Sequence, residues 1–83
     1  MTAKTILRDI KHWAKDSYEC GHPVEDINEF TDYFKDGFED EENFNKAMEL
    51  IKPLCHEDQT PIQYCCNYYY ECFDDARERD NNW

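Results

Sequence analysis

The sequence is poor in the residues that build nucleotide-binding loops and membrane spans. Its 83 residues include two glycines and three prolines, so it has no glycine-rich phosphate-binding loop. No apolar run approaches the ~20 residues that a membrane span requires. The N-terminal stretch lacks the continuous apolar centre of an export signal. We therefore expect a single cytoplasmic domain, residues 1–83, with no membrane contact.

Basic residues are also scarce, and the resulting charge is uneven. Nine Lys and Arg face 20 Asp and Glu, a net charge of −11. Residues 1–18 hold four basic and two acidic groups (+2), residues 19–42 ten acids and one lysine (−9), and residues 43–83 eight acids and four bases (−4). The bases near the N-terminus are too few, beside this acidity, for direct nucleic-acid binding. The negative charge belongs to the middle of the chain.

Five cysteines are present, but their number is odd, no export signal precedes them, and Cys65 and Cys66 are adjacent. Reduced, buried thiols are favoured over a disulfide framework. A catalytic cysteine needs an electropositive site, whereas these cysteines lie among acids, so we expect no enzymatic activity.

A zinc site is the remaining alternative for the cysteines. Cys20 with His22 and Cys55 with His56 fall in predicted loops, and together they could supply four ligands. Against this, no CxxC occurs, and adjacent side chains chelate one ion poorly. We expect no metal and no cofactor.

Four helices are predicted from apolar periodicity and end signals. Thr2 can cap the first, and Gly21 permits a left-handed residue after it. Pro23 suits the first turn of a second helix that runs to Gly37. Apolar residues recur at spacings of three and four along both segments. The inward-facing residues are Ile6, Leu7, Ile10, Trp13 and Ala14, then Ile27, Phe30 and Phe34.

Asp40 can cap a third helix that Pro53 closes, and Thr60 begins the fourth with a capping box completed by Gln63. The segment YCCNYYY is rich in strand-forming residues, but its helical period outweighs that propensity. The expected fold is all-α, a compact small bundle of about four helices. The inner faces of these two helices are Phe44, Ala47, Met48 and Ile51, then Ile62, Cys65, Cys66, Tyr69, Cys72, Phe73 and Ala76.

The densest charge lies in DYFKDGFEDEENF, which holds six carboxylates, one lysine and four aromatic residues. Counted at ~100° per residue, Glu25, Glu29, Asp32 and Asp36 share a stripe of about 60° opposite the apolar face of the second helix. Carboxylates four residues apart repel by about 0.2–0.5 kcal/mol. A stripe with a single lysine to relieve it favours a surface that binds something basic.

Neighbouring acids extend this stripe until the local charge density is close to that of a nucleic-acid strand, ~3.4 Å per phosphate. They are Asp26, Glu39, Asp40, Glu41 and Glu42. A solvated helix surface with acids that complement helix dipoles is the plainer alternative. A calcium loop aligned on Gly37 fails, because Phe34 and Asn43 stand where oxygen ligands are required.

A second candidate surface is the outer face of the fourth helix, where Tyr64 and Tyr68 lie among acids. Tyrosines are favoured interface anchors, although these two could equally lean on neighbouring helices. This face supports the alternative function of a protein–protein adaptor or a homodimerising regulatory module.

In size, net charge and its acid-dense middle, EDINEFTDYFKDGFEDEENF, the chain resembles small phage-encoded inhibitors, including anti-CRISPR proteins and DNA mimics. The resemblance implies a non-enzymatic inhibitor that blocks a basic nucleic-acid-binding site in the host cytoplasm. The expected partner is a basic nucleic-acid-binding protein or ribonucleoprotein complex, with a homodimer also open. The partner-binding residues would be Glu25, Asp26, Glu29, Asp32, Asp36, Glu39, Asp40, Glu41 and Glu42, with Tyr64 and Tyr68.

Overall fold

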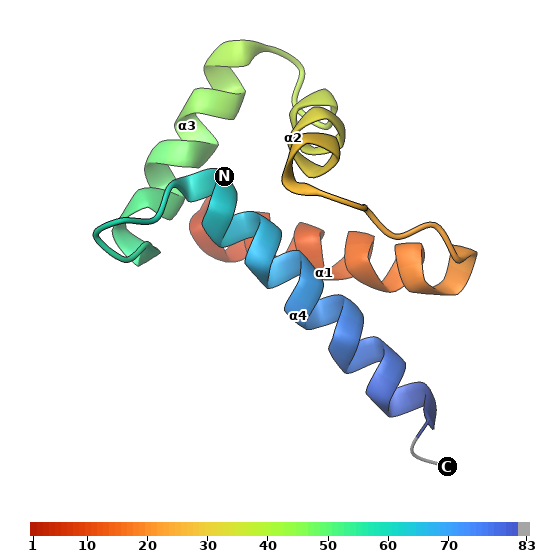
Figure 1. Ribbon diagram of the computed structural model, residues 1–83. Coiled ribbons are helices and arrows are strands. Elements are labelled where there is room, and N and C mark those ends of the chain that lie inside the picture. Colours follow the sequence, from red (N-terminus) through yellow and green to blue (C-terminus); the bar gives the residue numbers. More distant parts are fainter. Residues whose placement is uncertain (82–83) are drawn as a thin grey trace.

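Four α-helices and one short 3-10 turn make up the computed structural model, which describes residues 1–81. No residue in this part of the chain belongs to a strand. The predicted all-α fold of four helices is confirmed. In chain order the elements are α1 (Ala3–Cys20), α2 (Ile27–Asp36), α3 (Glu41–Ile51), the 3-10 turn η1 (Lys52–Leu54) and α4 (Pro61–Asn81), as Figure 1 shows.

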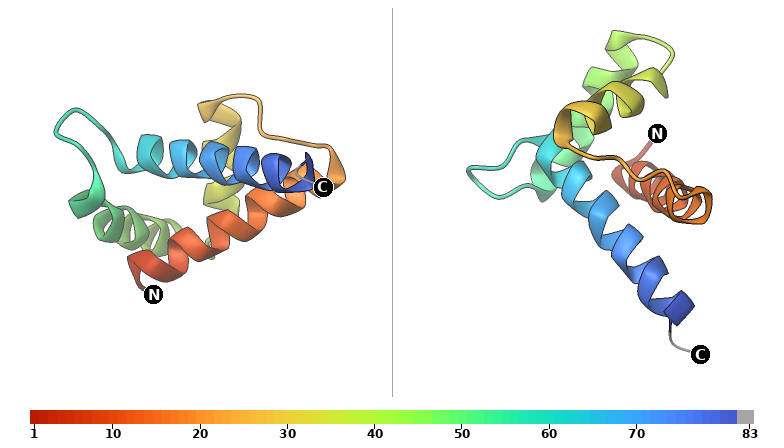
Figure 2. Two further views of the ribbon diagram at one scale, coloured as in Figure 1. Left: turned by 90° about the horizontal axis from the view of Figure 1, so that it is seen from below. Right: turned by 45° about the vertical axis from the view of Figure 1, so that its right-hand side comes forward.

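The helix α4 holds the fold together, because it contacts all three other α-helices and α1 most extensively. In Figure 1, α1 and α4 cross, while α2 and α3 lie at the opposite end of the molecule from the C-terminal half of α4. The views in Figure 2 show the same arrangement. The molecule measures 42 × 26 × 22 Å. The acid-rich connection between α2 and α3 therefore forms one edge of the protein.

Side chains at the helix ends make the hydrogen bonds that the sequence predicts. Thr2 Oγ1 accepts the Thr5 N–H at 3.2 Å. The Thr60 N–H donates to Gln63 Oε1 at 2.9 Å, and the Gln63 N–H donates to Thr60 Oγ1 at 3.1 Å. Gly21 follows α1 with a φ of 74°, a left-handed conformation that favours glycine. The predicted starts of α1 and α4 and the end of α1 are confirmed.

The predicted start of the second helix at Pro23 is wrong, because α2 begins at Ile27. Asp26 is its N-cap, and the Asp26 carboxylate accepts the Glu29 N–H at 2.8 Å. Ile27 is then the first residue of the helix and is 39% exposed, so its predicted place in the core is also wrong.

The residues before α2 are held outside the helix by α4. Val24 is buried, and its N–H donates to the Tyr69 hydroxyl at 3.2 Å. The Tyr70 hydroxyl donates to the Val24 carbonyl at 3.0 Å. Tyrosines therefore satisfy both backbone groups of Val24, and Tyr70 takes the carbonyl that a helix starting at Pro23 would use for a helical hydrogen bond. The helix α2 accordingly starts later than the proline suggests.

Aromatic rings fill the centre of the core. Trp13 of α1 stacks on Phe30 of α2 with ring centroids 5.1 Å apart, and its centroid lies 4.9 Å from that of Tyr69 in α4. Phe30 and Tyr69 are fully buried. A second group, Phe34, Phe38 and Phe44, joins α2 to α3 by edge-to-face contacts. These rings fix α2 against α1 and α4 and so set which side of α2 faces outward.

Candidate functional site

Three carboxylates share the outward side of α2. Glu29, Asp32 and Asp36 are spaced by three and four residues, which places them within about 60° of one another around the helix axis. Phe30 and Phe34, on the opposite side, are buried. The predicted stripe is present for these three acids. Glu25 precedes the helix by two residues, so its predicted place on the helical stripe is wrong.

The lysine of the acidic segment does not neutralise the stripe. Lys35 Nζ lies 5.6 Å from the centroid of the Phe44 ring, a cation–π distance. Of the predicted partner-binding acids, only Glu42 forms an ion pair within the part of the chain that the structure describes. The ion pairs there are Arg8–Asp9, Lys46–Glu42, Arg77–Asp74 and Arg79–Asp75.

Several of the predicted acids have a role in the fold itself. Asp26 caps α2, and Asp40 caps α3 by accepting the Asn43 N–H at 2.8 Å. Glu29 lies in the first turn of α2, and Glu41 and Glu42 lie in the first turn of α3, where the helix dipole favours negative charge. These acids would be expected on grounds of stability alone.

Other acids of the segment have no such role. Asp32 is exposed in the middle of α2, Asp36 is its last residue, and Glu39 lies exposed in the connection to α3. A carboxylate at the C-terminal end of a helix meets the negative end of the dipole and costs about 0.3–1 kcal/mol. Asp32 and Asp36 also repel each other across one helical turn. Helix stability therefore gives no reason for these charges.

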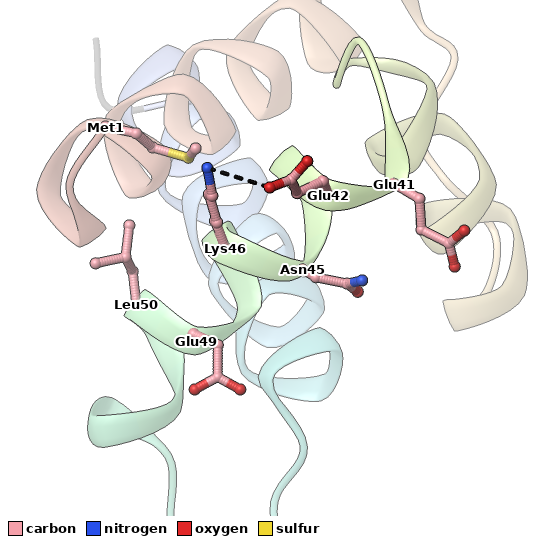
Figure 3. A pocket seen from close by; sticks show the side chains of 7 residues that line it. All are labelled: Met1, Glu41, Glu42, Asn45, Lys46, Glu49 and Leu50. Carbon is pink, nitrogen blue, oxygen red and sulfur yellow. Dashed lines mark ion pairs between the residues drawn. The ribbon is translucent and has the colours of Figure 1, made fainter.

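On the outer side of α3 the charges are mixed. Figure 3 shows Lys46 pointing toward Glu42, with Nζ and Oε1 3.7 Å apart, while the Glu41 carboxylate points away. Met1 and Leu50 line the same open depression and are 59% and 38% exposed. Lys46 therefore offsets part of the acidity on this side of α3, whereas no ion pair forms on α2 or on the α2–α3 connection among the described residues.

A cavity of about 450 Å³ lies where α1, the residues before α2, and α2 itself meet. Glu25 and Glu29 both line it, together with Trp13 and Tyr33. The structure thus brings Glu25 beside Glu29 by a shared cavity and not by a shared helical face. This cavity could not be predicted from the sequence, because Trp13 reaches it from another helix.

Tyr33 is a residue of the site that was not among those predicted from the sequence. Its side chain is 58% exposed on α2, and it follows Glu29 by one helical turn. Tyrosine at i+4 from a carboxylate of the stripe places an aromatic ring on the acidic face. That spacing was visible in the sequence and could have identified it.

Tyr64 and Tyr68 are less available than an outer helix face suggests. Both are partly buried and pack against the core. Burial, with the neighbouring Cys72 as the next cause, raises the pKa of the Tyr68 hydroxyl. These contacts explain the two tyrosines by packing within the protein.

The five cysteines are free thiols, and Cys65 and Cys66 are buried. Burial raises the pKa of Cys65 to about 12 and raises the pKa of Cys66, so both are protonated at neutral pH. Within the described residues no group of three or more His, Cys, Asp or Glu could hold a metal ion. The pairs Cys20–His22 and Cys55–His56 are therefore not assembled into the alternative zinc site.

Comparisons with protein-family models, with curated proteins and with solved structures find no match to this chain. Among the described residues, no helix is both long enough and apolar enough to cross a membrane.

Proposed function

We propose that this protein is a non-enzymatic inhibitor whose acidic surface occupies the basic nucleic-acid-binding site of a host defence complex, in the manner of anti-CRISPR proteins and DNA mimics. The observation that carries the proposal is the set of exposed acids Asp32, Asp36 and Glu39. They have no basic partner among the described residues and no role in capping or dipole stabilisation. Their charge is available to another molecule.

The spacing of the carboxylates suits a basic partner surface that ordinarily binds nucleic-acid phosphates. From Glu29 to Asp36 the helix rises by roughly 10 Å and carries three carboxylates, about one per 5 Å. A DNA strand carries one phosphate per ~3.4 Å. Glu39 and the caps and first turns of α2 and α3 add further charge beside the stripe. Such a density favours rapid, salt-sensitive association with a groove lined by Lys and Arg.

The experiment is a displacement assay with purified CRISPR effector complexes and fluorescently labelled target DNA. Increasing protein should release the DNA, with a fall in its fluorescence anisotropy. The double reversal Asp32→Lys and Asp36→Lys should raise the concentration required by about tenfold or more, because attraction becomes repulsion. Raising salt from about 50 to about 300 mM should weaken the unmodified protein strongly, because the interaction is screened.

The matched control reverses Glu57 and Asp58, two exposed acids before α4, and changes the net charge by the same amount. It should displace DNA almost as well as the unmodified protein. If the two double reversals behaved alike, a specific acidic interface would be excluded. If binding to the effector complex instead required Tyr64 and Tyr68 and did not change with salt concentration, the adaptor function would be favoured.

A further inference from the structure

We infer that the cavity lined by Glu25, Glu29 and Tyr33 is a binding pocket for one cationic side chain, the guanidinium of an arginine on the basic partner. The inference deepens the proposed function and rests on it for the basic character of that partner. The acidic surface would then bind a cation at one defined pocket, in addition to attracting cations by its net negative charge.

The walls of the pocket are held in place from several sides. Trp13 lines it while stacking on the buried ring of Phe30, with centroids 5.1 Å apart. Val24 also lines it and is fixed by hydrogen bonds to Tyr69 and to Tyr70. Glu25, the next residue, is therefore attached to a fixed backbone. A pocket whose walls are already ordered loses less conformational entropy when a ligand binds.

The side chains of the pocket match the chemistry of a guanidinium group. Glu25 and Glu29 are carboxylates with no ion pair among the described residues, and charge-assisted hydrogen bonds to guanidinium are strong and often bidentate. Tyr33 and Trp13 offer aromatic surface, on which the planar guanidinium stacks better than a lysine ammonium. His22 lines the same cavity as a further polar group. The volume of about 450 Å³ is within the range of small-ligand sites, roughly 300–1,000 Å³.

A second groove in the protein has the opposite chemistry. It lies between α1 and α4, has a volume of about 760 Å³, and is lined by Lys11, Lys15 and Arg79 as well as by two acids. A cation would be repelled by the two lysines there. The field of residues 19–42, with a net charge of −9, also draws cations toward the end of the molecule that carries α2. We therefore expect a cationic ligand to bind in the cavity beside α2 and an anionic ligand to bind in the groove between α1 and α4.

The test is a two-dimensional ¹H–¹⁵N NMR titration with N-acetyl-arginine amide. We expect saturable shifts of the Trp13 indole N–H and of the backbone amides of residues 22–33. N-acetyl-citrulline amide has nearly the same shape without the charge, and it should produce shifts at least about tenfold weaker at the same concentration. Shifts of residues in the α1–α4 groove, or equal shifts with both compounds, would overturn the inference.

Variants then separate the pocket from general charge. The change Glu25→Gln with Glu29→Gln should weaken arginine binding by about tenfold, whereas Asp32→Asn with Asp36→Asn should change it by less than about twofold. Both pairs remove two charges. Tyr33→Ala should weaken binding, and Tyr33→Phe, which keeps the ring, should retain it. Equal weakening by the two acid pairs would show attraction to overall charge and would refute a pocket.

The pocket and the proposed function can fail separately. If arginine binds here but reversal of Asp32 and Asp36 leaves displacement of DNA unchanged, the inhibitor proposal is wrong and the pocket stands. If displacement depends on Asp32 and Asp36 but arginine does not perturb Trp13 and residues 22–33, the pocket is wrong and the proposed function stands.

Discussion

The backbone N–H of Val24 donates a hydrogen bond to the hydroxyl of Tyr69 at 3.2 Å, across 45 residues of sequence. The Tyr70 hydroxyl donates to the carbonyl of the same residue at 3.0 Å. Two adjacent tyrosines of α4 thus satisfy both backbone groups of one buried residue. Through Val24 they position the start of α2 and the neighbouring Glu25, and so connect the core to the candidate site.

The first prediction concerns these two tyrosines. Tyr69→Phe should lower the free energy of unfolding by about 1–3 kcal/mol, because the buried Val24 N–H loses its acceptor. Tyr70→Phe removes a donor from the Val24 carbonyl and should cost about 0.5–1.5 kcal/mol. Urea unfolding, monitored by circular dichroism, measures the free energy of unfolding of both variants. Tyr33→Phe, at an exposed position, serves as the control and should leave the urea midpoint almost unchanged.

A second prediction separates acids that stabilise the fold from acids that do not. Asp40→Ala should lower the free energy of unfolding by about 1 kcal/mol, because the Asn43 N–H loses its capping carboxylate. Glu39→Ala, one residue earlier and exposed, should change it by less than about 0.5 kcal/mol. Thermal and urea unfolding of the two variants would decide the matter. If Asp40→Ala were as stable as the unmodified protein, the Asp40 cap would contribute nothing to α3.

A third prediction is that one of the acids proposed to bind the partner is unfavourable for the fold. Asp36→Asn should raise the free energy of unfolding by about 0.3–1 kcal/mol at low ionic strength, because it relieves the dipole at the end of α2 and the repulsion from Asp32. The gain should shrink in high salt. The same variant should weaken displacement of DNA under the proposed function. A variant that is less stable in low salt would show that Asp36 has a favourable contact within the fold.

Much of the fold could be predicted because its signals are local. The caps at Thr2 and Thr60, the glycine after α1 and the period of apolar residues each depend on neighbours within four positions. The start of α2 could not be predicted in this way. Pro23 and Asp26 are both good start signals, and the choice between them depends on hydrogen bonds between Val24 and two tyrosines of α4, one donated and one accepted by Val24.

In the candidate site too, the features set by local sequence could be predicted, and those set by packing between helices could not. The outward position of Glu29, Asp32 and Asp36 follows from helical periodicity and was predicted correctly. The cavity that joins Glu25 to Trp13 depends on how α1 packs against α2, which no local pattern encodes. Tyr33 is predictable from its spacing, because it follows Glu29 by one helical turn.

The last prediction concerns stability at alkaline pH. Cys65 is fully buried, and desolvation, with Cys55 and Cys66 as lesser causes, raises its pKa from the ordinary value of 9.0 to about 12. Between those values the folded protein holds a thiol proton that the unfolded chain has released. The stabilisation that the protonated Cys65 thiol contributes is therefore fully present below pH 9. It is lost as the pH rises toward 12, and the free energy of unfolding then falls by up to about 1.4 kcal/mol per pH unit.

Removing the thiol should remove that contribution to the slope. Cys65→Ala will have its own constant cost from lost packing, but its free energy of unfolding should decline less steeply between pH 9 and 10.5 than that of the unmodified protein. Cys20→Ala, at an exposed position, should leave the slope unchanged. Urea midpoints measured at half-unit steps of pH give the slopes. Some decline should remain in Cys65→Ala, because burial also raises the pKa of Cys66 and of Tyr70. Parallel slopes for Cys65→Ala and the unmodified protein would mean that the Cys65 thiol ionises as readily in the folded chain as in the unfolded one.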